Sequence, residues 1–174
     1  PMHSDIIGNV FYQGTSPGSR YAPLQLGGAG ETMTGTEGDF NIAHNLFLNT
    51  ARNSVAILVT GNVDHVRIYN NAFLAVGISG SRLYERGDTW PSPATDAFVQ
   101  RRGSLDPMIE GANNWVSENV SGIPESLVNT ARGANPRFAD FLGQDYRPRV
   151  DSPLVHGGLS LLPPGQIGGL MPEY

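Results

Sequence analysis

Two residue types are missing from this chain of 174 residues, which contains neither cysteine nor lysine. The absence of cysteine excludes disulfide bonds and thiolate metal sites. All eleven basic side chains counted as Lys or Arg are arginines. A lysine general base within this chain is therefore excluded.

Charge is also scarce, since charged residues make up 16% of the chain and the formal net charge is −5. A nucleic-acid-binding surface needs clustered positive charge, so we do not expect a nucleic acid partner. No apolar run approaches the roughly 20 residues that a membrane-spanning helix needs, so no membrane span is expected. Glycine (22) and proline (13) are abundant, which favours many turns and short strands over long helices.

An Asn-x-aromatic phrase recurs along the chain. A second phrase, an apolar segment ending in glycine, alternates with it at 22–28, 55–61 and 97–103. Repetition of this kind predicts stacked units, each too small to bury its apolar face alone. The first phrase occurs at Asn9–Phe11, Asn45–Phe47, Asn71–Phe73 and Asn113–Trp115.

Alternating apolar residues within and around these phrases predict short β-strands. Three such strands per unit, without a helical period, are typical of the coils of a parallel β-helix. We therefore predict an all-β fold in which the recurring asparagines occupy sharp corners and hydrogen-bond one another. The aromatic residues Phe11, Phe47, Phe73 and Trp115 are predicted to stack in one interior column. The predicted strands are 5–7, 11–13, 22–26, 40–42, 47–49, 55–59, 66–68, 73–75 and 97–101.

The pattern fades after residue 116. We expect residues 1–116 to form the coils, and residues 117–174 to form the last coil and a closing segment, with a short helix at 124–130. The tail contains Asn135-Pro-Arg-Phe-Ala-Asp140, a second phrase from Asp145 to Arg149, and the phrase Ser152-Pro-Leu-Val-His-Gly-Gly158. It ends with Gly-Gln-Ile-Gly-Gly at 165–169 and Pro-Glu at 172–173.

This tail resembles the closing segment of secreted right-handed β-helix proteins of the pectate-lyase-like superfamily. With the coil phrases, the resemblance spans nearly the whole chain. It implies a right-handed parallel β-helix of about four to five coils in a secreted, extracellular or cell-surface protein. His156 and Gln166 depart from the family's usual aspartates. The superfamily includes lyases, hydrolases, epimerases and binding proteins, so the resemblance alone leaves enzymatic activity open.

The first strand begins without a capping helix. We therefore expect residues 5–11 to pair with strands outside this chain, either earlier coils or another subunit stacked on that end.

The resemblance places a polysaccharide groove along the sheet built from the glycine-ended phrases. Its outward positions would be Gln25, Leu58 and Gln100, which are all uncharged. The insertion at 77–96 is the best candidate for binding, because arginine pairs with uronate carboxylates and aromatic rings stack on sugars. Arg101 breaks the inward apolar column, so it either flares outward or pairs with an acid such as Glu110. The candidate substrate-binding residues are Arg82, Tyr84, Arg86, Asp88, Trp90, Gln100 and Arg101.

No catalytic set is complete in this sequence. Asp64 and His65 could form a base and its orienting acid, although a structural role is favoured because no nucleophile accompanies them. Carboxylate pairs for hydrolysis could come from Glu37 with Asp39 or from Glu85 with Asp88.

We expect no cofactor, although the resemblance allows Ca²⁺, for which Glu31, Glu37 and Asp39 could supply oxygen ligands. The leading hypothesis is an extracellular β-helix that binds or degrades a polysaccharide, which could be acidic. The alternative is a non-enzymatic structural or adhesive subunit of a surface assembly.

Overall fold

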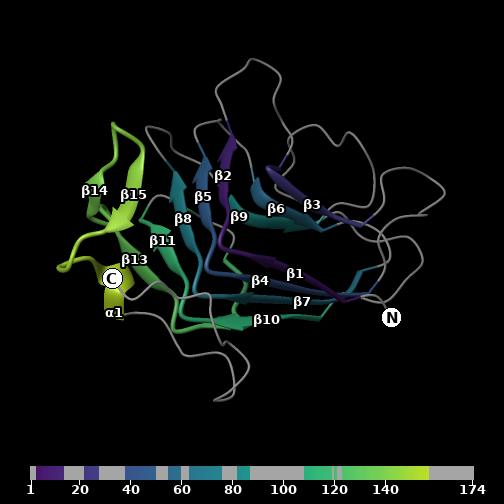
Figure 1. The fold of residues 1–174 in the computed structure, drawn as a ribbon. Helices are drawn as coiled ribbons and strands as arrows, with labels where there is room; N and C mark the ends of the chain where they lie inside the picture. Colours follow the sequence, from purple (N-terminus) through teal and green to yellow (C-terminus); the bar gives the residue numbers. More distant parts are fainter. Residues whose placement is uncertain are drawn as a thin grey trace, which may run out of the picture.

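A computed structural model describes residues 3–13, 22–27, 38–49, 55–59, 63–75, 82–86, 108–118, 120 and 123–156, with only the backbone of 13, 49, 55 and 82–86. These residues form fifteen strands and one short helix, so the predicted all-β class is confirmed (Figure 1). None of the described helices is long and apolar enough to cross a membrane.

Three sheets with parallel pairing contain most of the strands. The first sheet has the order β1 (His3–Ile7), β4 (Gly38–Ala43), β7 (Val63–Tyr69), β10 (Met108–Ala112) and β12 (Leu127–Val128). The second has the order β2 (Val10–Gln13), β5 (Leu46–Asn49), β8 (Ala72–Ala75), β11 (Trp115–Ser117) and β13 (Ala131–Gly133). The third has the order β3 (Leu24–Leu26), β6 (Val55–Val59) and β9 (Arg82–Arg86).

The chain visits the three sheets in turn. After β1, β2 and β3 it returns to the first sheet at β4, and the same order repeats with β7, β8 and β9. Eight of the nine predicted strands coincide with or overlap observed strands. The ninth, at 97–101, lies outside the described residues.

A continuous apolar interior lies between the sheets. Phe11, Phe47 and Phe73 occupy one register row of the second sheet. Their ring centroids lie 4.7 Å apart at each step, with nearly parallel planes, so the predicted aromatic column is confirmed for these three rings. Ile42, Ile57, Val66 and Ile68 are fully buried in the same core.

Trp115 does not belong to this column, so its predicted place was wrong. Trp115 is in register with Ala72, and Val116 takes the position next to Phe73. Trp115 is instead buried in a second cluster with Leu48, Leu74 and Phe138. In this unit the Asn-x-aromatic phrase is shifted by one residue relative to the strand register. Because neighbouring residues in a strand point to opposite faces, Trp115 lies on the other face from the phenylalanine column.

The corner between the first and second sheets repeats at each unit. The residue with positive φ is the one before the stacked asparagine, not the asparagine itself as predicted. Because a left-handed backbone favours glycine and asparagine, this position has few acceptable side chains. His44 occupies it in the second unit, with φ of 56°. The corner residues are Gly8, His44, Asn70, Asn113 and Asn129.

The following residues form an asparagine ladder, defined by Asn9, Asn45, Asn71 and Asn114. At each step the backbone N–H and the Nδ2 of one asparagine donate to the Oδ1 of the next, over 2.9–3.1 Å. Nδ2 of each of the last three also donates to a backbone carbonyl of the preceding unit, as from Asn45 to Ile6 O. The predicted hydrogen-bonded column is therefore confirmed, with Asn114 in the place expected of Asn113.

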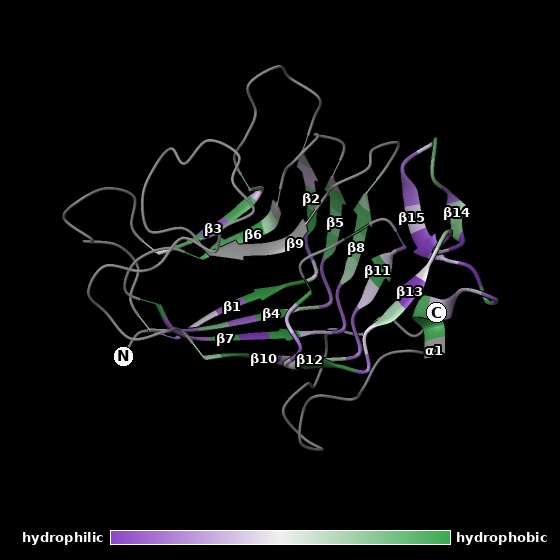
Figure 2. Cartoon of the chain, turned by 180° about the vertical axis from the view of Figure 1, so that it is seen from behind, coloured by the Kyte–Doolittle hydropathy of each residue, from purple (hydrophilic) through white to green (hydrophobic). Residues whose placement is uncertain are grey.

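A hairpin of β14 (Phe138–Asp140) and β15 (Asp145–Pro148) lies beside the second sheet. Phe138 packs with Trp115 and Leu74, so the hairpin covers the outer side of that sheet. Figure 2 shows that β5 and β8 are strongly hydrophobic, whereas β15 is mostly hydrophilic. The chain then forms α1 (Pro153–His156), whose first turn is capped by Ser152 Oγ accepting from Leu154 N.

The short helix expected at 124–130 is absent, because this segment forms a turn followed by β12. Gly111 N also bonds to Ser126 O, just before β12 pairs with β10. Pairing with an existing sheet edge therefore outweighed local helix propensity here.

Candidate functional site

The outer side of the first sheet carries a concentrated set of polar side chains, here called the polar face. Its side chains alternate with the buried apolar residues of the same strands, as the period of two requires. Register aligns them in two rows across β1, β4, β7 and β10. The polar face consists of His3, Asp5, Asp39, Asn41, His65, Arg67 and Glu110.

At one end of the polar face, a histidine, an aspartate and an asparagine contact one another. His3 Nε2 lies 3.0 Å from Asp5 Oδ1. Asn41 Nδ2 donates to Asp5 Oδ1 over 2.9 Å and lies 3.0 Å from His3 Nε2. These contacts join β1 to β4 through side chains as well as through the backbone.

Arg67 lies at the centre of the polar face, between two carboxylates. Its Nε donates to Glu110 Oε1 over 3.2 Å, and its Nη1 lies 3.8 Å from Asp39 Oδ2. The Arg67 side chain is about one third exposed, so these pairs are partly screened by water. The guanidinium is held by acids from both neighbouring strands, and its orientation is consequently restricted.

His65 and Asn41 each contain a polar atom with an unmet bonding capacity. His65 Nε2 lies 2.9 Å from Glu110 Oε1, yet this buried nitrogen has no hydrogen-bond partner among the described residues. Asn41 Oδ1 is likewise buried without a hydrogen-bond partner among the described residues. Buried polar atoms of this kind cost free energy until a partner reaches them.

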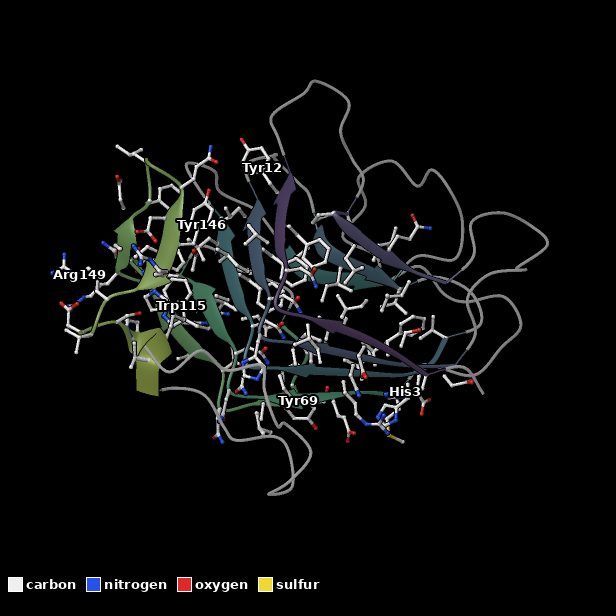
Figure 3. All side chains as sticks on the ribbon, in the orientation of Figure 1. His3, Tyr12, Tyr69, Trp115, Tyr146 and Arg149 are labelled. Carbon is white, nitrogen blue, oxygen red and sulfur yellow. The ribbon has the colours of Figure 1, made fainter. Side chains whose placement is uncertain are left out.

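Tyr69 continues the polar face toward the corner, two residues after Arg67 on β7. Figure 3 shows Tyr69 and His3 on the same side of the first sheet, away from the interior. Burial raises the pKa of Tyr69, and the Glu110 carboxylate raises it further while Arg67 opposes this effect. Its phenol is therefore a neutral hydroxyl group with an aromatic face near neutral pH.

The polar face carries more negative than positive charge. It contains the carboxylates of Asp5, Asp39 and Glu110 but the single guanidinium of Arg67. With neutral histidines the sum is three negative charges against one positive charge, which disfavours an anionic ligand. Carboxylates, an amide and a guanidinium together accept and donate hydrogen bonds, as an uncharged hydroxyl-rich ligand requires.

Three of the seven sequence-predicted binding residues lie on a different sheet. Arg82, Tyr84 and Arg86 belong to β9, which pairs in parallel with β6, so the expected insertion loop contains a strand. Its register places Glu85 beside Leu58, in the row that starts at Gln25. The other predicted residues, Asp88, Trp90, Gln100 and Arg101, lie outside the described residues.

Two smaller expectations concern His65 and Glu110. His65 contacts Glu110 rather than forming a close pair with Asp64, which is exposed at a register shift between β4 and β7. Glu110 pairs with Arg67 and is not a buried acid, since its side chain is 42% exposed.

The residues proposed for Ca²⁺ do not come together as one described group. Asp39 lies near Arg67, whereas Glu31 and Glu37 lie outside the described residues. In the described part of the chain no three His, Asp or Glu side chains form a group that could hold a metal ion.

The polar face was missed in the sequence, although a signal for it exists. Polar residues two positions apart precede the corner in three units, as His3 and Asp5, Asp39 and Asn41, and His65 and Arg67.

Comparisons with protein-family models, curated proteins and solved structures find no match for this chain.

Proposed function

We propose that this chain is a right-handed parallel β-helix of an extracellular protein and that it binds a polysaccharide along the polar face. The fold proposal is supported by the repeating visit to three parallel sheets and by the continuous asparagine ladder. Such stacking gives long, flat, regular outer surfaces, which suit a repeating polymer.

The observation that carries the functional proposal is the row Asp5–Asn41–Arg67–Glu110. These residues lie opposite one another on consecutive strands, so their backbones are spaced by about 4.8 Å. Each strand presents a hydrogen-bonding group to the same side, while Tyr69 adds an aromatic surface. Rigid strands hold these groups in place, which limits the entropy lost on binding.

The charge balance favours a neutral polysaccharide over an acidic one at the polar face. Asp39 and Glu110 are both engaged by Arg67, and Asp5 is engaged by Asn41 and His3. Carboxylates held in this way accept hydrogen bonds from sugar hydroxyls but are poorly placed to abstract or deliver protons. Binding rather than bond cleavage is therefore the function proposed for the polar face.

The test compares binding of the chain to neutral polysaccharides (xylan, galactomannan and cellulose) and to acidic ones (pectate and alginate) by calorimetry or pull-down. Arg67→Ala should weaken binding to the neutral polymer by about tenfold, the loss expected when one charge-assisted contact is removed. Arg149→Ala is the matched control, because Arg149 is exposed on the tail away from the polar face.

Binding to pectate or alginate that is unaffected by Arg67→Ala would contradict this assignment. Unsaturated products detected by ultraviolet absorbance would contradict it as well, because they would identify a lyase. The first result would instead favour a site near Arg82 and Arg86 on β9.

A further inference from the structure

A third row of outward side chains lies between the polar face and the corner, and is here called the alanine–tyrosine row. Register places Ala43 of β4, Tyr69 of β7 and Ala112 of β10 opposite one another on consecutive strands. The residues before the first two, Ile42 and Ile68, are fully buried in the core. Because side chains alternate along a strand, the row points to the outer side of the sheet, as Figure 3 shows for Tyr69.

Burial within this row indicates how the ring of Tyr69 lies. Tyr69 is only partly exposed, although its two neighbours in the row are alanines. Ala43 and Ala112 are in turn only 9% and 7% exposed, although both face outward. Tyr69 is the large neighbour that they share in the row, so a ring that lies against the sheet accounts for both observations. The row therefore presents a low aromatic and aliphatic surface.

Hydrogen-bonding groups border this row on both sides. On one side is the row of the polar face that contains Asn41, Arg67 and Glu110. On the other side are the corner residues of the same three strands, each of them at least partly exposed, which are His44, Asn70 and Asn113. Backbone hydrogen bonds from His44 N and Asn70 N to the next strand keep these corners aligned. The low surface is thus flanked by donors and acceptors along both of its edges.

This arrangement matches the two kinds of surface that a sugar ring can offer. A pyranose whose hydroxyl groups are all equatorial has two faces of C–H groups and a rim of hydroxyls. The faces can pack on an aromatic ring, while the rim can form hydrogen bonds on either side. An axial hydroxyl would instead point at the alanine–tyrosine row, where burying it without a partner costs free energy.

The linkage between the sugars matters as well. In a β-1,4-linked chain of such sugars the linkages are equatorial, so the chain is a straight, flat ribbon that can follow the row from β4 to β10. Successive units are turned over, so axial hydroxyls would reach the row from whichever face of the ribbon packed on it. We propose that the alanine–tyrosine row selects β-1,4-linked polysaccharides with equatorial hydroxyl groups, such as cellulose and xylan, and that Tyr69 determines this specificity. The selectivity rests on the proposed function, because it names the class of neutral polymer that the polar face binds.

Cellohexaose and mannohexaose test the proposal, because these β-1,4-linked oligosaccharides of equal length differ only in the orientation of the hydroxyl at C2. Calorimetry should show that the full chain binds cellohexaose about tenfold more tightly than mannohexaose. Tyr69→Ala should weaken cellohexaose binding by about tenfold and remove the preference. Tyr69→Phe should keep the preference, because the ring and not the hydroxyl group makes the contact.

Tyr12→Ala is the matched control for the loss of a tyrosine. Tyr12 is 66% exposed on β2 of the second sheet, and Figure 3 shows it on the opposite side of the fold from Tyr69. This variant should bind both oligosaccharides as the wild type does. Circular dichroism melts verify that each variant is folded.

Arg67→Ala distinguishes a failure of this selectivity from a failure of the proposed function. It should weaken binding of both oligosaccharides, because a guanidinium donates to the hydroxyls of either sugar. If it does so but the wild type binds both equally, or if Tyr69→Ala keeps the preference, the selectivity is wrong and the proposed function stands. If neither oligosaccharide binds, or if Arg67→Ala changes neither affinity, both proposals fail.

Discussion

Replacement of Asn71 should show how much the asparagine ladder stabilises the fold. Asn71 is 1% exposed. Its Oδ1 accepts from Asn45 N and Nδ2, and its Nδ2 donates to Asn114 Oδ1, Ile42 O and Tyr69 O. Asn71→Ala leaves the buried N–H of Asn45 without an acceptor and removes the donor to two backbone carbonyls.

One orphaned buried donor costs about 1–3 kcal/mol, and each lost hydrogen bond contributes about 0.5–1.5 kcal/mol more. With one orphaned donor and two carbonyls that lose a bond, we therefore expect Asn71→Ala to lower the free energy of unfolding by about 2–6 kcal/mol. Asn71→Asp should be worse, because it retains the acceptor but faces three oxygen atoms with a buried negative charge. Urea unfolding followed by the fluorescence of the buried Trp115 measures both effects.

Asn9→Ala is the matched control at the exposed end of the ladder. It removes bonds to Asn45 Oδ1 and Ile7 O but orphans no buried donor, and water reaches the exposed Asn9, so its cost should lie at the low end of two lost bonds, about 1 kcal/mol. Equal destabilisation by Asn71→Ala and Asn9→Ala would refute the reasoning. It would mean that the ladder hydrogen bonds contribute no more in the interior than at the surface.

Three further predictions concern the interior and the tail. Phe47→Ala should destabilise the fold by about 3–5 kcal/mol, measured by urea unfolding, because Phe47 is fully buried between two stacked rings; a loss below about 1 kcal/mol would contradict the buried column. Gly111→Ala should prevent pairing of β10 with β7, because the added methyl group would overlap the Ile68 carbonyl; a native-like circular dichroism melt would show that this reasoning is wrong. Hydrogen bonds from Arg147 lower the pKa of Asp145 to about 2, so its stabilising contribution is present above its ordinary pKa of 3.8 and is lost as the pH falls toward 2. An NMR titration checks this value, and Arg147→Ala should return the pKa of Asp145 toward its ordinary range.

The sequence was informative where local pattern and tertiary pairing agree. The strands before and after each corner alternate clearly, and the Asn45 and Asn71 phrases fall into register without ambiguity. At Asn113-Asn114-Trp115 two asparagines adjoin, so the phrase can be aligned in two ways. The tryptophan favoured the wrong alignment, and the ladder hydrogen bond to Asn114 shows the observed one.

Other features depend on contacts that a single sequence does not display. Arg82–Arg86 contains three charged residues and lacks a strand-like apolar pattern, so its pairing with β6 was not predicted. Most of the polar face became apparent only when register aligned residues as distant as Asp5 and Glu110. The polar alternation could have been recognised, whereas the central position of Arg67 between two acids requires the strand order.

The asparagine ladder has a consequence for protein engineering. Successive ladder residues are separated by 36, 26 and 43 positions, yet their hydrogen bonds have nearly the same lengths. The alignment of each ladder asparagine with the next one is thus independent of the number of residues between them. Peptides of quite different sizes could be grafted between a third-sheet strand and the first-sheet strand that follows it. The strand framework would then fix the position of each insert along the axis on which the units stack.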